Sequence, residues 1–255
     1  MNFYSAKAHH YLSLVKFSHT IFALPFAMIG FALAITLSKK SFDLRLFLLI
    51  IMCMVFARSA AMAFNRYIDK NIDKKNPRTA IREIPSGTIS PQSALMFTFI
   101  NIILFIVSAF FINKLCFFLS PVALFVILGY SFTKRFTFLC HIILGIGLSL
   151  APIGAYIAVT GEFNLLPLLY SFAVLFWVSG FDIIYSLQDE DFDKSQKLKS
   201  IPVKLGRKKS LHLSETFHCI TALLIIYAGL YAHFGILYWT GSIIFSFFVI
   251  MDLVF

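Results

Sequence analysis

Charged residues are scarce in this sequence. Only 13% of its 255 residues are Asp, Glu, Lys or Arg, whereas 59% are hydrophobic, and the mean hydropathy is +0.85. Soluble domains have about twice this share of charged residues, which they place on the polar faces of their helices. The shortage of charge therefore excludes a water-soluble globular protein and predicts an integral membrane protein.

Cysteine is also sparse, and the four cysteines are far apart. Cys53, Cys116, Cys140 and Cys219 stand singly in apolar segments, without a Cys-x-x-Cys pair. This spacing argues against a zinc site and against a framework of disulfide bonds. We expect ordinary buried or lipid-facing thiols.

Long apolar runs make up most of the chain. They recur at about twenty residues, which is roughly the length that an α-helix needs to cross a bilayer. The first run is too long for the apolar part of a signal peptide, so we expect a retained helix. The predicted fold is an all-α polytopic transmembrane helical bundle with loops that cap its cytoplasmic end, in a single domain over residues 1–255. We predict eight helices, at 17–37, 44–64, 94–112, 115–132, 138–159, 165–187, 211–232 and 234–254.

Lysine and arginine indicate the orientation of this bundle. The odd-numbered loops between predicted helices hold only Lys39, Lys40, Arg45 and Lys114. By the positive-inside rule, the N-terminus and the even-numbered loops are cytoplasmic. The net charge of +10 then reflects orientation, and we expect no nucleic-acid partner. The basic residues of the even-numbered loops are Arg66, Lys70, Lys74, Lys75, Arg78, Arg82, Lys134, Arg135, Lys194, Lys197, Lys199, Lys204, Arg207, Lys208 and Lys209.

Acidic residues gather in two of these loops, although acids contribute little to orientation. The segments "YIDKNIDKK" and "LQDEDFDKS" share the pattern Asp-x-x-x-Asp-Lys, and four predicted helices separate them. Both segments therefore lie on the same side of the membrane. Eight of the twelve acids lie in or beside them: Asp69, Asp73, Glu83, Asp182, Asp189, Glu190, Asp191 and Asp193.

The spacing within each segment suggests a cation site. Residues four apart on a helix are neighbours, with Cβ atoms about 5–6 Å apart, so Asp69 and Asp73 share a face with Asn65, and Asp189 shares one with Asp193. Two converging carboxylate pairs repel each other unless cations lie between them. Oxygen ligands without nearby His or Cys favour Mg²⁺, which often binds substrate phosphates as well. The surrounding Lys and Arg would then bind a polyanion such as diphosphate.

Four segments resemble one known family. "NRYIDKNIDKKNPRTAIREIPSG" and "DIIYSLQDEDFDK" are similar to the two aspartate-rich motifs of the UbiA superfamily of intramembrane aromatic prenyltransferases. "KFSHTIFALPFA" (16–27) and "YSFTKRFTFLCH" (130–141) resemble segments of its bacterial 4-hydroxybenzoate polyprenyltransferase branch. The resemblance covers most of residues 10–210. Members of this family usually have nine transmembrane helices, one more than we predict here.

The resemblance implies a site for Mg²⁺ and a polyprenyl diphosphate, with the isoprenoid tail in an apolar tunnel open to the bilayer. It also implies an aromatic acid acceptor, the bacterial inner membrane and a site on the cytoplasmic side; nothing in the sequence points to an obligate protein partner. The implied metal ligands are Asn65, Asp69, Asp73, Asp189 and Asp193, the four aspartates being catalytic. The implied diphosphate-binding residues are Asn65, Arg78, Arg82, Tyr130, Lys134 and Arg135.

Arg58 lies within the second predicted helix, where a cation costs about 2.5–3.5 kcal/mol or more. It precedes Asn65 by two helical turns and so lies roughly on the face of the first motif. Two interpretations remain open: Arg58 binds the carboxylate of an aromatic acceptor, or it pairs with an aspartate of the bundle such as Asp182. Asp182 is itself a candidate on the acceptor side.

The sequence thus predicts a Mg²⁺-dependent transferase that moves a polyprenyl group onto an aromatic acid such as 4-hydroxybenzoate, in the biosynthesis of a respiratory quinone. Within the family, a naphthoate or another quinone precursor is an alternative acceptor. An ion-coupled transporter is the alternative from another class, because transporters also use intramembrane acids.

Overall fold

The structure is a computed structural model that describes residues 10–251. Over these residues it is helical and contains no β-strand. Three short elements, η1 (Leu187–Asp189), α8 (Glu190–Ser195) and α9 (Ile201–Leu205), lie between two of the long helices. The long helices are α2 (Phe17–Ser38), α3 (Leu44–Asp73), α4 (Pro91–Ile112), α5 (Lys114–Thr133), α6 (Cys140–Thr160), α7 (Leu165–Ser186), α10 (Arg207–Tyr231) and α11 (Ile236–Met251).

Each of the eight predicted spans falls on one of these long helices. Within the described part of the chain, six helices are long and apolar enough to cross a membrane, and α2 and α11 contribute the shorter apolar stretches Ala23–Ser38 and Ile236–Phe247. The all-α membrane bundle is therefore confirmed. The end of the last predicted span, 252–254, lies outside the described residues.

The first aspartate motif continues a membrane helix. Helix α3 begins after Asp43, whose carboxylate accepts hydrogen bonds from the amides of Arg45 and Leu46 at 2.9 and 3.2 Å. It runs on beyond the predicted end at residue 64 and reaches Asp73. Asn65, Asp69 and Asp73 thus lie one turn apart on a continuous helix.

The second motif is built differently from our prediction. Helix α7 ends at Ser186, and the chain passes through η1 before α8 begins at Glu190. Asp189 lies at this break with φ −108° and ψ 7°, outside the helical region. Asp189 and Asp193 therefore do not lie on one uninterrupted α-helix as expected: Asp189 ends a 3₁₀ turn, and Asp193 lies on the short helix α8 that follows it.

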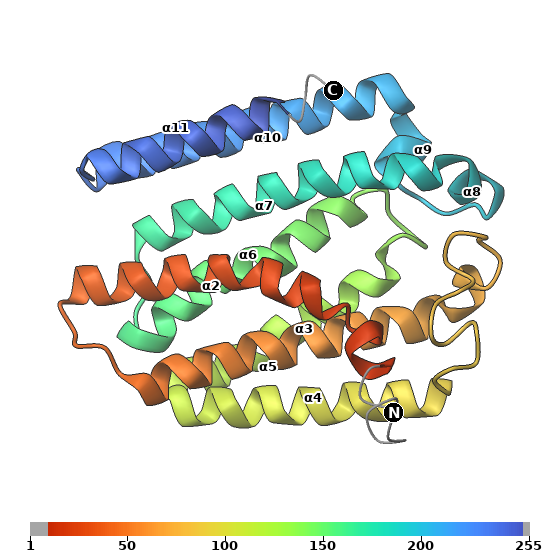
Figure 1. Ribbon diagram of the computed structural model, residues 1–255, viewed down its shortest axis with the longest axis horizontal. Coiled ribbons are helices and arrows are strands. Elements are labelled where there is room, and N and C mark those ends of the chain that lie inside the picture. The colour runs from red at the N-terminus through yellow and green to blue at the C-terminus, as the bar shows by residue number, and fades with distance from the viewer. Residues whose placement is uncertain (1–9, 252–255) are drawn as a thin grey trace.

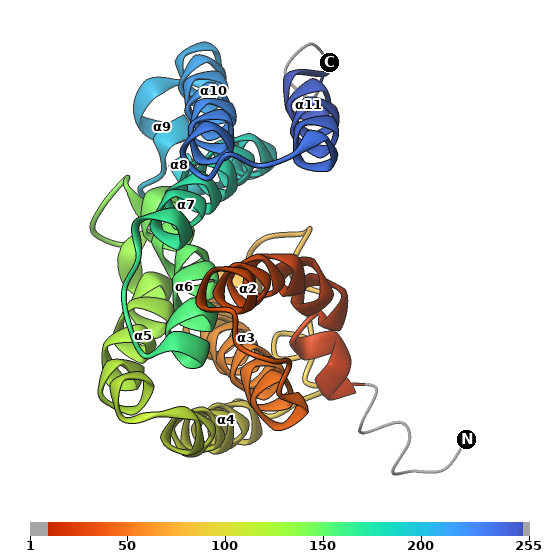
Figure 2. The same ribbon diagram turned by 90° about the vertical axis from the view of Figure 1, so that its left-hand side faces the viewer.

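The long helices run side by side along the longest axis of the molecule (Figure 1). Helix α3 packs against α4, α6 lies between α2 and α7, and α10 packs on α7. Figure 2 shows α11 beside α10, away from α4 and α5. The loop between α3 and α4 lies at the same end of the molecule as α8 and α9, so the fold brings the two aspartate motifs to one end.

Helices α2 and α6 pack closely enough to make a testable prediction. A Cβ atom on Gly30 would lie 1.9 Å from the carbonyl oxygen of Pro152, and neither backbone can move without shifting a helix. We expect Gly30→Ala to lower the free energy of unfolding by about 1–3 kcal/mol or more, measured as a lower thermal midpoint in nanodiscs. Gly154→Ala on α6 is the control, because nothing lies within 4 Å of its Cβ position. Equal midpoints for the two variants would contradict the packing described here.

Candidate active site

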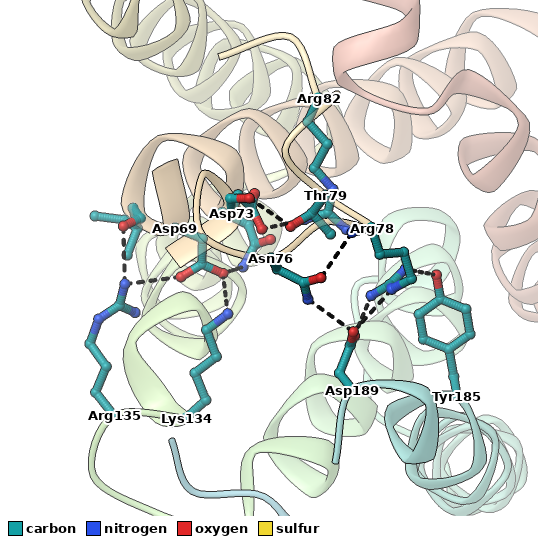
Figure 3. Close-up of polar contacts among 12 residues, drawn as sticks. Asp69, Asp73, Asn76, Arg78, Thr79, Arg82, Lys134, Arg135, Tyr185 and Asp189 are labelled. Atoms are coloured by element: carbon teal, nitrogen blue, oxygen red, sulfur yellow. Dashed lines mark hydrogen bonds and ion pairs between the residues drawn. The ribbon is translucent and has the colours of Figure 1, made fainter. Parts of the chain in front are cut away.

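Asp69 is a buried carboxylate that pairs with two cations. It is 2% exposed; its Oδ2 lies 2.6 Å from Nζ of Lys134, and its Oδ1 lies 2.9 Å from Nη2 of Arg135. Asn65, one turn earlier on α3, donates to Oδ2 at 3.3 Å. The basic pair that follows α5 therefore lies directly against the first aspartate motif (Figure 3).

Asp73 pairs through one carboxylate oxygen, and its other carboxylate oxygen has no partner within residues 10–251. Its Oδ1 lies 2.7 Å from Nη1 of Arg82, and its carbonyl oxygen accepts a hydrogen bond from Oγ1 of Thr79 at 3.0 Å. Its Oδ2 is buried and has no hydrogen-bond partner in the described part of the chain. A buried carboxylate oxygen without a donor is costly, and a cation would satisfy it.

Asp189 joins the second motif to the loop after α3. Arg78 binds both of its carboxylate oxygens, through Nε at 3.0 Å and through Nη2, and Asn76 donates to Oδ1 at 3.0 Å. The hydrogen bonds that the Arg78 guanidinium donates to the Asp189 carboxylate raise the pKa of Arg78 above its usual value. Arg78 also donates to the hydroxyl of Tyr185 at 3.0 Å. This forked pairing holds the two motif loops together, as Figure 3 shows.

Asp193 lies on α8 and is half-buried. Its carbonyl oxygen accepts a hydrogen bond from the amide of Leu198 at 2.9 Å. The cation that acts most strongly on its carboxylate is Lys134, which also pairs with Asp69. Lys134 therefore lies between the two motifs.

The donor set of this site suits Mg²⁺ better than a metal that needs a full protein cage. In the described residues, no group of three His, Cys, Asp or Glu side chains is close enough to hold a metal. Mg²⁺ does not require such a cage, because it usually takes one or two carboxylates and completes its shell with water and phosphate oxygens. The oxygen-only donors and the unpartnered Oδ2 of Asp73 fit that mode.

An apolar cavity of about 230 Å³ lies among helices α2 to α6. Its lining is mostly small and aliphatic; its aromatic rings come from Phe105 and Tyr130, and its charged residue is Arg58. Nε of Arg58 is buried and has no partner in the described part of the chain. Asp182 instead pairs with Nδ1 of His141 at 2.7 Å. Among the described residues Asp182 thus pairs with His141 and forms no ion pair with Arg58, and Arg58, which is partly buried, lines the cavity.

The sequence analysis did not assign four residues to the site that the structure places at or beside it. Asn76 binds Asp189. Arg66 is 4% exposed, and its Nε has no hydrogen-bond partner among residues 10–251. Both lie inside the quoted first motif. Lys16 is the third of these residues. The pKa of its ammonium group is lowered, first by burial and second by the positive charge of Arg66. His141 ends the quoted segment 130–141. All four lie within the quoted segments, and this was the signal that the sequence offered. Their partners are distant in the sequence, so the contacts themselves could not be predicted.

Fold and site together define an integral membrane protein with a cluster of carboxylate and cationic groups at one end of an apolar cavity. The chain belongs to the UbiA prenyltransferase family, whose model matches residues 23–255. The protein is therefore a membrane prenyltransferase, and the resemblance seen in its motifs is confirmed.

Curated relatives agree with this assignment. The 4-hydroxybenzoate octaprenyltransferase of Aliivibrio fischeri (strain MJ11) is 31% identical over 201 residues, covering 77% of this chain and 69% of the relative. The enzyme of the same name from Francisella tularensis subsp. novicida (strain U112) is 28% identical over 199 residues, covering 78% and 70%.

Solved structures share the fold. An apo structure of a UbiA homolog from Aeropyrum pernix K1 matches with a TM-score of 0.86 and 34% identity, over 93% of this chain and 88% of that one. A UbiA homolog from Archaeoglobus fulgidus bound to DMAPP and Mg²⁺ matches with a TM-score of 0.78 and 23% identity, over 96% and 85%. At this lower identity the second match concerns the fold alone.

Proposed function

We propose that this prenyltransferase moves a polyprenyl group from polyprenyl diphosphate to an aromatic acid such as 4-hydroxybenzoate, with Mg²⁺, as a step in respiratory quinone biosynthesis. The observation that carries the proposal is the meeting of two aspartate motifs and four basic side chains beside one apolar cavity. We also propose a bacterial inner membrane as its location; the positive-inside pattern supports a site on the cytoplasmic face.

The metal would be held by oxygen atoms of both motifs, from Asn65, Asp69, Asp73, Asp189 and Asp193. The unpartnered Oδ2 of Asp73 supports this assignment, and the A. fulgidus protein of the same fold binds Mg²⁺ together with DMAPP. When bound, Mg²⁺ supplies a Lewis acid that stabilises the negative charge of a leaving diphosphate.

The basic side chains would bind the same diphosphate. Lys134 and Arg135 are held by Asp69, Arg82 by Asp73 and Arg78 by Asp189. Cations that are already oriented need little rearrangement as charge builds up on the leaving group, and such preorganised electrostatics is usually the largest contribution to catalysis.

The apolar cavity would receive the first part of the isoprenoid tail and keep water away from the allylic carbon as its C–O bond breaks. Alanine is the commonest residue in its lining, followed by leucine and isoleucine. Tyr130 lines the cavity and precedes Lys134 by one turn of the chain, so it would lie between the tail and the diphosphate.

Arg58 is the proposed anchor for the carboxylate of the aromatic acceptor, and Asp182 is a second candidate on that side. We expect Arg58→Ala to raise the KM of the acceptor at least about tenfold, the loss of one charge-assisted hydrogen bond, and to leave the KM of prenyl diphosphate unchanged. Steady-state kinetics with each substrate varied in turn measures both. Arg45→Ala, an exposed arginine near the other end of α3, is the control. A change confined to the KM of prenyl diphosphate would refute this role.

The decisive experiment for the function uses membranes that contain the protein, a labelled polyprenyl diphosphate and a panel of aromatic acids, with and without Mg²⁺. We expect a labelled product that forms only with Mg²⁺ and one class of acceptor. A product formed only from a naphthoate would replace the acceptor we propose. No product from any acceptor, together with ion-coupled uptake of a solute, would refute the function.

A further inference from the structure

His141 lies at the start of α6 and contacts two other helices, α7 and α9. It is 3% exposed. Its Nδ1 lies 2.7 Å from Oδ2 of Asp182 on α7, and its Nε2 lies 3.3 Å from the amide nitrogen of Ile201, the first residue of α9. Ser179 on α7 donates to its carbonyl oxygen at 3.2 Å.

The two ring contacts determine which nitrogen carries the proton. The amide of Ile201 can only donate, so Nε2 of His141 must be the acceptor. The proton then lies on Nδ1 and is donated to the carboxylate of Asp182. One imidazole thus makes two different hydrogen bonds, and neither can reverse its direction while the other is kept.

Asp182 and Ile201 stand at the two ends of a single segment, 183–200. This segment includes η1 and α8 and carries Asp189 and Asp193, the two carboxylates of the second motif. We propose that His141 is a positioning residue. Its two hydrogen bonds, to Asp182 and to Ile201, join the ends of this segment and so hold the second motif in place; we call this pair of bonds the clasp. Joining both ends of a segment to one side chain removes much of its conformational freedom. The proposal rests on the proposed function, in which Asp189 and Asp193 hold Mg²⁺.

Further contacts connect this clasp to the basic pair. The amide of Lys199 donates to the carbonyl oxygen of Lys134 at 2.8 Å, and its Nζ donates to that of Phe136 at 3.1 Å. Sγ of Cys140, next to His141, lies 3.6 Å from the carbonyl oxygen of Lys199. The downstream end of the segment is therefore fastened to the loop that presents Lys134. Opening the clasp should disturb the distance between the second motif and the basic pair, not only the local fold.

Three substitutions at position 141 separate the two bonds. His141→Leu removes both hydrogen bonds and puts an apolar side chain of similar size in place of the imidazole. The amide of His141→Asn reaches only as far as Nδ1 and can still donate to Asp182, whereas that of His141→Gln reaches the level of Nε2 and can still accept from Ile201. Ser179→Ala is the matched control, because it removes a buried hydrogen bond to the same residue without touching the imidazole.

The test measures two quantities for the full chain in nanodiscs. Hydrogen–deuterium exchange reports on residues 187–200, and a Mg²⁺ titration gives the concentration for half-maximal turnover. For His141→Leu we expect faster exchange confined to this segment and a Mg²⁺ requirement raised about 10–100-fold, the usual effect of losing a group that orients metal ligands. The Asn and Gln variants should lie between Leu and wild type, and Ser179→Ala should match wild type. If the Leu variant does not insert, the Asn and Gln variants provide the same comparison.

Several outcomes would overturn the proposal. One is wild-type exchange of 187–200 in His141→Leu; another is faster exchange throughout the protein at an unchanged Mg²⁺ requirement, which would mean that His141 only stabilises the fold. A rise in the KM of the acceptor alone would mean that His141 acts with Asp182 in binding the acceptor, and not in positioning the second motif. Failure of the proposed function would be seen separately, as absent turnover in wild type. Exchange would then still decide whether the clasp exists.

Discussion

Asp69→Asn is expected to lower kcat/KM for prenyl transfer by about 10²–10³-fold, the range for losing one preorganised group that stabilises charge. The substitution keeps the shape of the side chain but removes the negative charge that Lys134 and Arg135 share. Both cations lose their common anchor, and the proposed metal site loses a ligand. Lys134 and Arg135 are partly exposed, so water can solvate them and the protein should still insert into the membrane.

The measurement is turnover of labelled prenyl diphosphate in nanodiscs, normalised to inserted protein. Asp43→Asn is the matched control: it makes the same chemical change at the other end of α3, where Asp43 caps the helix and Asn caps about equally well. That variant should have wild-type activity. Turnover of Asp69→Asn within about tenfold of wild type, a difference of about 1.4 kcal/mol in the barrier, would remove Asp69 from the catalytic residues.

Asp189→Asn should cause a loss of similar size, about 10²–10³-fold, through the second motif. Its carboxylate holds Arg78 by a forked ion pair and accepts a hydrogen bond from Asn76. The substitution weakens both contacts and removes a proposed metal ligand. We expect the Mg²⁺ concentration for half-maximal turnover to rise together with the loss of kcat.

Arg78→Gln separates the two roles of Asp189. It removes the cation from the ion pair but leaves the carboxylate and its bond to Asn76. We expect a smaller loss for Arg78→Gln, seen mainly in the KM of prenyl diphosphate, with the Mg²⁺ requirement unchanged. Equal losses in both variants, with no shift in the Mg²⁺ titration of Asp189→Asn, would show that Asp189 acts only as an anchor for Arg78.

The positions of the helices could be predicted from the sequence because they depend on local properties. An apolar run of about twenty residues is stable in lipid only as a helix, whatever surrounds it. The same holds for the first motif: Asn65, Asp69 and Asp73 follow helical spacing, and α3 continues through all three. That the two motifs lie at one end of the bundle could also be predicted, because an even number of predicted helices separates them.

The second motif shows where sequence reasoning failed. Its spacing also suited a helix, yet the chain leaves α7 at Ser186 and turns at Asp189. The groups that hold Asp189 are Asn76 and Arg78, which are 113 and 111 residues away in the sequence. Local periodicity contains no information about such partners, so it could not predict the break.

Composition and motif spacing were therefore enough for the fold class and the membrane setting. The pairing of each carboxylate with a particular cation, the unpartnered oxygen of Asp73 and the closure of 183–200 on His141 became visible only in the folded chain. The reason is physical: a helix forms from its own residues and the lipid around it, whereas an ion pair or a clasp forms only after separate helices have packed and brought distant side chains within hydrogen-bond distance.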